Sequence, residues 1–414
     1  MSDAAIPFED AVARIASACD ALDVRTVALA DAAGRVLAHD LFAEDDLVPF
    51  ARSAMDGFAI VAADARERDT FSVRGRAYAE GAPRRVHEPG TATAIATGAP
   101  IPGGADAVVP FEDTVESNGS IRLLEPRAVY AGAHVFPPGE DARRGDVVGR
   151  RGDVLRPASL ALLASAGHAR FDVVRKPRAC VVTSGQEIVP VSASPGFGEI
   201  RNSNATAVVA ALATFGAEVV DVVHVRDDRA DVRRAIGRAA ERADVVVTTG
   251  GASVGERDYV KSALDELGAA FAFREVAMRP GRPSALATLG ESRVLALPGN
   301  PAAVSVALHE LVRVAIARLA GARDVRLPRV GARLRGTLRE KGDRTYFAFA
   351  ALGVDADGRL EALPLDNQCS ALTRTSADAG GFAVVGPDRG DVRDGELVDV
   401  DVFDWDGVRA AVRV

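Results

Sequence analysis

The chain has 414 residues, of which 48% are hydrophobic and 5% aromatic, and its formal net charge is -8. This length predicts about two to four domains, at roughly 100–200 residues each, and the apolar content is sufficient for hydrophobic cores. The acidic balance and the shortage of aromatic residues argue against a general nucleic-acid binder and against a base-stacking surface.

The three cysteines, Cys19, Cys180 and Cys369, show no paired spacing and indicate a reducing compartment. The amino terminus is acidic and lacks the apolar core of a signal peptide. No apolar run reaches the ~18 residues that a membrane span requires. We therefore expect a cytoplasmic protein without a membrane segment.

The amino-terminal half combines helices with a β-rich stretch. Apolar residues recur at helical spacing over 8–22, and a second helix is predicted over 155–167. Short alternating runs separated by Gly and Pro predict a β-rich domain over 41–145. We assign 1–40 and 146–175 to a helical, linking part of a discontinuous amino-terminal domain.

Strands and helices then alternate, in a domain that we assign to 176–326. This order predicts an open, mostly parallel sheet with helices on both faces. Short alternating runs return after Pro328 and predict a small all-β domain over 327–414. The expected fold class is therefore multidomain α/β plus β. The alternating elements are predicted at 179–182, 202–215, 218–225, 231–242, 244–248, 259–267, 293–297 and 301–319.

Four loops follow predicted strands of this α/β segment, and each offers groups that suit an anion or a metal ion. Because the carboxyl ends of parallel strands lie at one edge of a sheet, we expect the four loops to form one site. The loops are Thr183–Glu187, Arg226–Asp228, Gly250–Gly255 with Asp258 just beyond it, and Pro298–Pro301.

Three acids, Glu187, Asp227 and Asp258, come just past predicted strands. Together they could hold Mg²⁺ between protein and phosphate oxygens. Taken singly, each is more typical of a helix N-cap. Since Asp227 and Asp228 directly precede a helix, one of this pair is expected to cap it.

The glycine-rich loop admits two interpretations. Gly250, Gly251 and Gly255 can expose backbone N–H groups to a phosphate, or they can simply make a tight turn. The loop also matches the G-x-S-x-G nucleophile elbow of α/β-hydrolases, with Ser253 as nucleophile. That fold needs a histidine on a late loop, and the only later histidine, His309, falls in a predicted helix. We therefore favour phosphate binding.

Two further turns could bind anions. In the loop Pro298-Gly299-Asn300-Pro301, Pro301 suits the first helical position and Asn300 the N-cap, which leaves a helix end available. Arg279 and Arg282 stand on a turn stiffened by prolines. They could grip an oxyanion in forked geometry, or they could lie on a solvated loop.

The chain resembles the molybdopterin molybdenumtransferase family, to which the carboxy-terminal region of gephyrin also belongs. The likeness runs in order through nearly the whole chain. Its motifs here are Ser53-Ala-Met-Asp-Gly-Phe-Ala59, Thr97-Gly-Ala-Pro-Ile-Pro102, Ala105-Asp-Ala-Val-Val-Pro110, Gly139-Glu-Asp141, Ser184–Glu187, Ile200-Arg-Asn-Ser-Asn204, Gly250–Asp258, Pro280-Gly-Arg-Pro283 and Leu297–Pro301.

The resemblance implies an elongated homodimer with an α/β molybdopterin-binding domain and a carboxy-terminal β-barrel. It implies a reaction in which adenylylated molybdopterin and molybdate react with the help of Mg²⁺, AMP is released, and molybdenum stays on the dithiolene. Partners would include a molybdopterin adenylyltransferase and molybdoenzymes. The positions that resemble the family's functional residues are Asp56, Thr97, Glu187, Asp227, Asp258, Arg279, Arg282, Pro298 and Pro301.

The chain departs from the family pattern at several positions. Lysine is common where Arg279 and Arg282 stand, and Glu275 occupies a position that is often basic. Ala302-Ala303 and Cys369-Ser370 replace a usual Val-Ser and Gly-Ser. Alternatives are therefore a paralogue with altered metal preference, such as tungstate, a serine hydrolase or an adenylyltransferase on the same α/β domain, and a non-catalytic scaffolding protein.

Overall fold

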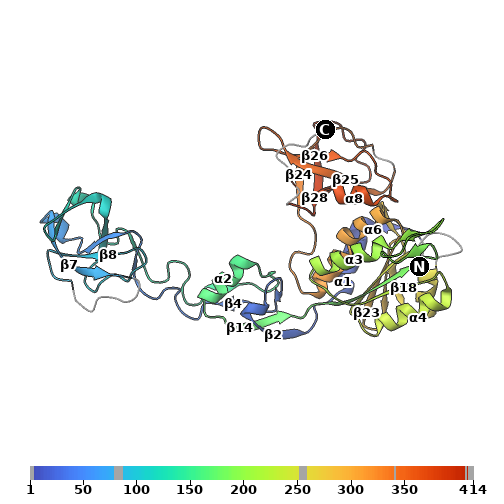
Figure 1. The fold of residues 1–414 in the computed structure, drawn as a ribbon, viewed down its shortest axis with the longest axis horizontal. Helices are drawn as coiled ribbons and strands as arrows, with labels where there is room; N and C mark the ends of the chain where they lie inside the picture. The colour runs from blue at the N-terminus through green and yellow to red at the C-terminus, as the bar shows by residue number, and fades with distance from the viewer. Residues whose placement is uncertain (1–3, 79–86, 251–258, 340–341, 406–407, 409–414) are drawn as a thin grey trace.

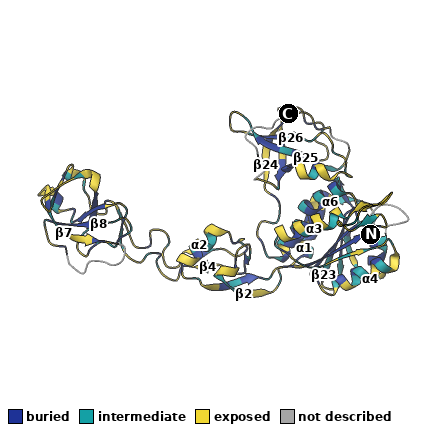
Figure 2. Cartoon of the chain, viewed as in Figure 1, coloured by how far each residue is buried: buried dark blue, intermediate teal, exposed yellow. Residues whose placement is uncertain are grey.

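The computed structural model describes residues 4–78, 87–250, 259–339, 342–405 and 408. Figure 1 shows an elongated chain with a β-rich distal lobe around β7 and β8, a small central lobe, and an α/β domain beside a carboxy-terminal barrel. Buried residues gather separately in each part (Figure 2). None of the described helices is long and apolar enough to cross a membrane.

The distal lobe is built on a six-stranded sheet in the order β10-β11-β7-β8-β6-β9. Phe58, Phe71 and Ile121 lie in its core. Gly57 is required at the start of β6, because a Cβ there would lie 2.1 Å from the carbonyl oxygen of Val109. The strands are β6 (Gly57–Ile60), β7 (Thr70–Ala77), β8 (Thr91–Ile95), β9 (Ala107–Pro110), β10 (Thr114–Ser117) and β11 (Ser120–Leu123).

The central lobe has its own small core, which includes Leu37, Leu163 and Phe171. A three-stranded sheet and two short strand pairs, β4 with β13 and β5 with β12, surround it. Its elements are β2 (Val24–Ala28), β3 (Val36–Leu37), β4 (Leu41–Phe42), β5 (Arg52–Ser53), β12 (Val135–Phe136), β13 (Val147–Gly149), α2 (Pro157–Ser165) and β14 (Arg170–Val174). Short 3-10 turns in the two lobes cover Leu29–Asp31, Asp64–Arg66, Phe111–Asp113 and Pro126–Ala128.

A six-stranded sheet in the order β18-β15-β19-β23-β22-β20 forms the α/β domain. The first four strands are parallel, which confirms the open, mostly parallel sheet, whereas β22 and β20 add an antiparallel edge. Alternate residues of β15 and β19 enter two cores on opposite faces. The strands are β15 (Arg178–Ser184), β18 (Glu218–Val225), β19 (Val245–Thr249), β20 (Ala270–Phe273), β22 (Ala285–Leu289) and β23 (Ser292–Leu297).

Helices cover both faces of this sheet. One face packs against α3, α6, α7 and α1, and the other against α4 and α5. The domain boundaries stay predictions, but α1 buries Phe8, Val12 and Ile15 in the α/β core and not in the central lobe. The helices are α1 (Phe8–Ala18), α3 (Ser203–Thr214), α4 (Arg229–Ala240), α5 (Tyr259–Glu266), α6 (Pro301–Ala307) and α7 (Arg313–Leu319).

The carboxy-terminal strands close into a five-stranded barrel, because β25 pairs with both β26 and β27. This confirms the β-barrel expected from the resemblance. Strand β21 (Val276–Arg279) pairs with β25, and β1 (Ile6–Pro7) pairs with β21, so the barrel wall continues toward the α/β domain. The barrel elements are β24 (Arg329–Leu334), β25 (Thr345–Val354), β26 (Leu360–Pro364), α8 (Thr373–Asp378), β27 (Gly381–Val385) and β28 (Leu397–Val402).

The helix predicted over 301–319 contains a π turn, Leu308–Val312, between α6 and α7. Glu310 in this turn is 4% exposed, and its Oε1 has no hydrogen-bond partner among the described residues. Burial raises the pKa of Glu310 to about 8, and the nearby Asp401 carboxylate raises it further. The neighbouring His309 stacks on Phe403 with ring centroids 4.6 Å apart, and burial lowers its pKa to about 4.

Replacing Glu310 with glutamine should flatten part of the pH dependence of stability. With a folded pKa of about 8 against an ordinary 4.5, Glu310 is protonated when folded and ionised when unfolded across that interval. Its stabilising contribution is complete below pH 4.5 and is lost as the pH rises through 8. The expected slope is about 1.4 kcal/mol per pH unit. Above pH 6.5, His309 is neutral in both states and adds no slope of its own.

Urea denaturation of both proteins at about pH 6.8 and about pH 7.8 checks this expectation. The wild-type protein should lose on the order of 1 kcal/mol more unfolding free energy over this interval than Glu310→Gln. Equal losses in the two proteins would contradict a raised pKa at Glu310.

Candidate active site

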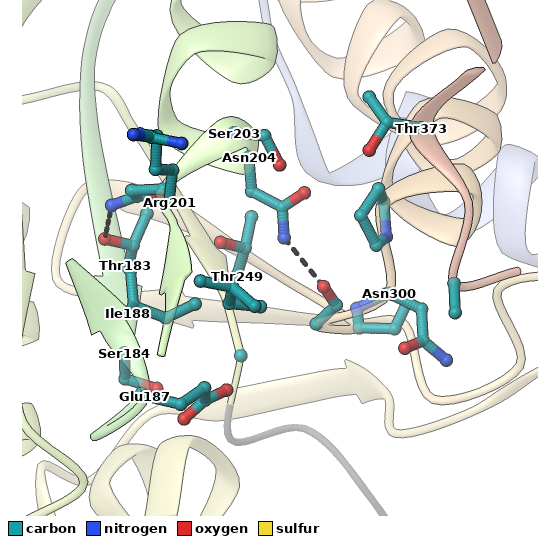
Figure 3. Close-up of a pocket in the computed structure, with 18 of the residues that line it drawn as sticks. Thr183, Ser184, Glu187, Ile188, Arg201, Ser203, Asn204, Thr249, Asn300 and Thr373 are labelled. Carbon is teal, nitrogen blue, oxygen red and sulfur yellow. Dashed lines mark hydrogen bonds between the residues drawn. The ribbon is translucent and has the colours of Figure 1, made fainter. Parts of the chain in front are cut away.

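A cavity of about 630 Å³ opens at the carboxyl edge of the α/β sheet (Figure 3). The loops after β15, β18, β19 and β23 all contribute to its wall, so the four loops singled out in the sequence do meet. The barrel adds Ala371 and Thr373. The candidate residues that line this cavity are Glu187, Asp227, Gly250, Pro298, Gly299, Asn300 and Pro301.

The two acids after β18 have different surroundings. Asp228 caps α4, because its Oδ1 accepts hydrogen bonds from the backbone N–H groups of Ala230 and Asp231, both at 2.9 Å. Asp227 lines the cavity, and its Oδ1 is buried with no hydrogen-bond partner in the described part of the chain. A buried acceptor left unpaired is costly, so Asp227 offers the cavity an unused ligand atom.

Gly250 allows the ends of β19 and β15 to approach closely. Its φ is +91°, and a Cβ would lie 2.4 Å from the carbonyl oxygen of Ser184. Only glycine tolerates this backbone conformation and contact without strain. The Oγ of Ser184 is also buried without a described partner. Glu187, at the end of the same loop, lines the cavity with an exposed side chain.

Two asparagines hold the start of α3 against the sheet edge. Asn202 Nδ2 donates to Thr183 Oγ1 at 2.9 Å, and its Oδ1 accepts from the N–H of Ala205 at 3.0 Å as the helix N-cap. Asn204 Nδ2 donates to the carbonyl oxygen of Gly299 at 2.7 Å (Figure 3). These contacts fix the amino end of α3 in the cavity wall, where the positive end of a helix favours an anion.

The expected role of Asn300 as a side-chain cap is wrong. Asn300 occupies the N-cap position of α6 and Pro301 the first helical position, but the Asn300 side chain makes no capping hydrogen bond. Its Nδ2 donates to Ser370 Oγ at 3.2 Å, while the Ser370 carbonyl accepts from Ala302 N–H at 3.0 Å. The contact that replaced capping therefore joins the barrel to the cavity.

Arg279 and Arg282 do not line this cavity, and they have different partners. The Arg279 guanidinium lies 5.4 Å from the ring centroid of Tyr346 and borders a second cavity, of about 460 Å³, on the barrel. Arg282 Nε donates to the buried carboxylate of Glu275 at 2.8 Å. Of this turn, Pro283 reaches the first cavity. The two arginines therefore do not stand as one forked pair.

Asp56 and Thr97 lie together on the distal lobe, where the N–H of Thr97 donates to Asp56 Oδ1 at 2.8 Å. Both residues are exposed. Figure 1 shows their lobe at the opposite end of the chain from the α/β domain. The remaining candidates, Gly251, Ser253, Gly255 and Asp258, lie outside the described residues.

Several polar residues of the cavity were not singled out as site residues from the sequence. The available signal was the Asn-Ser-Asn stretch before α3, which is typical of a helix cap and occurs in one of the family-like motifs. No local pattern pointed to the barrel residues. The residues concerned are Thr183, Ser184, Arg201, Asn202, Ser203, Asn204, Thr249 and Thr373.

Comparisons with known proteins agree with this architecture along the whole chain. Three family models match in order: the MoeA N-terminal region (domain I and II) at residues 6–167, a probable molybdopterin binding domain at 180–318, and the MoeA C-terminal region (domain IV) at 331–403. These matches define a multidomain protein of the MoeA type, built around an α/β domain of the molybdopterin-binding class.

The chain is 34% identical to the molybdopterin molybdenumtransferase of Haemophilus influenzae over 91% of its length and 93% of that protein. It is 36% identical to the Bacillus subtilis molybdopterin molybdenumtransferase, over 74% of this chain and 73% of that one. The crystal structure of the molybdopterin biosynthesis moea protein from Pyrococcus horikosii aligns with a TM-score of 0.77, at 29% identity, over 97% of this chain and 100% of that chain. The chain belongs to the molybdopterin molybdenumtransferase family.

Proposed function

We propose that this chain transfers molybdenum from molybdate to adenylylated molybdopterin and releases AMP. By its family and domains, the chain is a transferase of molybdenum cofactor biosynthesis. The observation that carries the proposal is the cavity at the sheet edge, where loops after four strands bring together acids, a close-packed glycine and the start of α3. Such a set suits a phosphate-bearing substrate.

Glu187 and Asp227 are the residues that would hold Mg²⁺ in this cavity. Among the described residues there is no cluster of three His, Cys, Asp or Glu side chains that could ligate a metal. Two carboxylates nevertheless fit Mg²⁺, which completes its shell with water and substrate phosphate oxygens. The unpaired buried Oδ1 of Asp227 supports this assignment. When bound, Mg²⁺ supplies positive charge to an anhydride that is being cleaved.

The chain's own residues orient the substrate around that position. The amino end of α3, fixed by Asn202 and Asn204, accepts a phosphate group. The bond from Asn300 to Ser370 holds the barrel in place as part of the wall. Asp258 and Ser253 are proposed to line the same site, the first as a metal ligand and the second as a phosphate contact.

The active unit is proposed to be a homodimer with shared sites. Asp56 and Thr97 lie far from the cavity of their own chain (Figure 1), which supports a site completed by the distal lobe of a second copy. A two-fold dimer would supply two such composite sites. Three free cysteines, two of them buried, support a reducing, cytoplasmic setting. A molybdopterin adenylyltransferase and molybdoenzymes are the proposed partners.

A serine hydrolase is less well supported. Its histidine would be His309, which is packed among Phe215, Phe382 and Phe403 beneath the barrel. A hydrolase needs that ring on an open loop beside the nucleophile. No feature of the described residues favours an adenylyltransferase or a scaffold without activity.

Release of AMP from adenylylated molybdopterin, measured with and without molybdate, tests the proposed function. AMP release that depends on molybdate, with molybdenum bound to the pterin product, is expected. Tungstate in place of molybdate examines metal preference. Absence of AMP release with both oxyanions from a folded dimer would refute the proposal.

Replacing Arg279 with alanine should raise the molybdate concentration for half-maximal activity by about ten-fold, if its free guanidinium meets the oxyanion. Arg282→Ala should raise it by only about two- to three-fold, because the buried Glu275 already engages the Arg282 charge. Titration of molybdate against product formation measures both values. Unchanged half-saturation in both variants would leave this turn outside the site.

A further inference from the structure

A separate cleft lies where the central lobe meets the α/β domain. It encloses about 370 Å³ between the turn before β3, the linker from β14 to β15, the end of α3 and helix α7. A neighbouring cavity of about 810 Å³ shares Val154, Arg156, Arg313 and Asp324 with it, so the two form one continuous groove. None of its residues belongs to the candidate active site.

This cleft concentrates positive charge in a chain whose net charge is -8. Asp324 is the one acid that lines it, against five basic residues. Arg175 is neutralised, since it makes two hydrogen bonds to the carboxylate of Asp244, at 2.7 and 2.6 Å. The other basic residues have no ion pair with any described acid, and they are Arg35, Arg156, Lys176 and Arg313.

Two of these guanidinium groups are held in position with unused donors. The Nε atoms of Arg35 and Arg313 are buried and have no hydrogen-bond partner among the described residues. A terminal nitrogen of Arg35 donates to the Val174 carbonyl at 3.1 Å, and the Arg313 guanidinium lies 5.6 Å from the Phe215 ring centroid. Burial lowers the pKa of both arginines, so both charges are poorly solvated where they stand.

We propose that this cleft binds a small, multiply charged oxyanion, with the chemistry shared by inorganic phosphate and the phosphate monoester of a nucleotide. Guanidinium donors match the oxygens of such an anion. Arg35 and Arg156 come from the central lobe, Lys176 from the linker and Arg313 from α7. The anion therefore bridges two units with separate cores and offsets the mutual repulsion of like charges between them.

Equilibrium dialysis of the full chain with radiolabelled inorganic phosphate, at low ionic strength, tests the proposal. Arg313→Gln should weaken phosphate binding by about ten-fold or more, and Lys176→Gln, whose charge is exposed, by about three-fold. Arg122→Gln on the distal lobe makes the same change of charge far from the cleft and should leave the affinity unchanged. Because Lys176 is exposed, its variant keeps the test valid even if Arg313→Gln does not fold.

Hydrogen–deuterium exchange with and without phosphate locates the bound anion. Phosphate should slow amide exchange at 174–176 and 213–216, which border the cleft from two sides. Competition by AMP distinguishes the sources: stronger binding of AMP than of phosphate identifies a nucleotide monoester, and the reverse identifies a free oxyanion. Equal phosphate affinity in all four proteins, or slowed exchange only at 183–188 and 201–204, would overturn the proposal.

Discussion

Replacing Asp227 with asparagine should slow AMP release by about 10²–10³-fold without unfolding the chain, a loss typical of removing a group that stabilises transition-state charge. Asp227 has a cavity-lining carboxylate whose Oδ1 is buried and unpaired among the described residues. The amide has nearly the same shape but lacks the charge that attracts a divalent cation. Raising the Mg²⁺ concentration should therefore recover part of the lost rate.

The neighbouring Asp228 supplies a matched control. Asp228→Asn makes the same chemical change one residue away, but Asp228 caps α4 and asparagine is an equally good N-cap. Its rate of AMP release and its thermal stability should stay close to those of the wild type. If Asp227→Asn also keeps a near wild-type rate at limiting Mg²⁺, Asp227 is not a ligand of the reacting group.

Mixing Asp56→Ala with Asp227→Ala subunits should restore activity that neither variant has alone. If each site takes Asp56 from one subunit and Asp227 from the other, every mixed dimer has one complete site and one site that lacks both acids. Random exchange makes about half of the dimers mixed, so roughly a quarter of the wild-type rate should return. The distance of the distal lobe from the cavity of its own chain motivates this expectation (Figure 1).

Subunit exchange must be demonstrated separately, for example by native mass spectrometry of differently tagged chains. Mixing Asp56→Ala with Thr97→Ala subunits gives a useful contrast, because Asp56 and Thr97 lie in contact on one lobe. In that mixture every site lacks one of the two residues or both residues are supplied by the same subunit, so recovery depends only on dimers whose chosen pairs are whole. No recovery in the Asp56 and Asp227 mixture, despite proven exchange, would refute the shared site.

The sequence was most informative where a periodic pattern and a buried face coincide. Continuous apolar runs separated by helices predicted the parallel strands, because such strands are buried on both faces. The four loops were found for the same reason, since topology alone brings the ends of parallel strands together. Asp228 as the cap of α4 followed from local chemistry. The antiparallel strands β20 and β22 were missed, because short apolar runs carry no periodic signature.

Contacts between distant segments could not be predicted from local patterns. The bond from Asn300 to Ser370 spans 70 residues and overrides the capping preference of asparagine. The pairing of Arg282 with Glu275 depends on the fold of a single turn, and it separates two arginines that looked equivalent. Likewise, α1 is amphipathic in any context, and only the tertiary structure decides which core receives its apolar face.

The placement of α1 has a consequence for synthesis of the chain on the ribosome. Phe8 packs edge-on against Phe347 with ring centroids 4.9 Å apart, and the N–H of Leu22 donates to the carbonyl of Leu319 at 2.9 Å. The first helix to be translated therefore has no place to dock until some 300 further residues have followed, roughly 15–60 s at bacterial elongation rates. Both lobes can fold in that interval on local contacts. Closure of the α/β domain must come last, so a chaperone that shields the apolar face of α1 should act early.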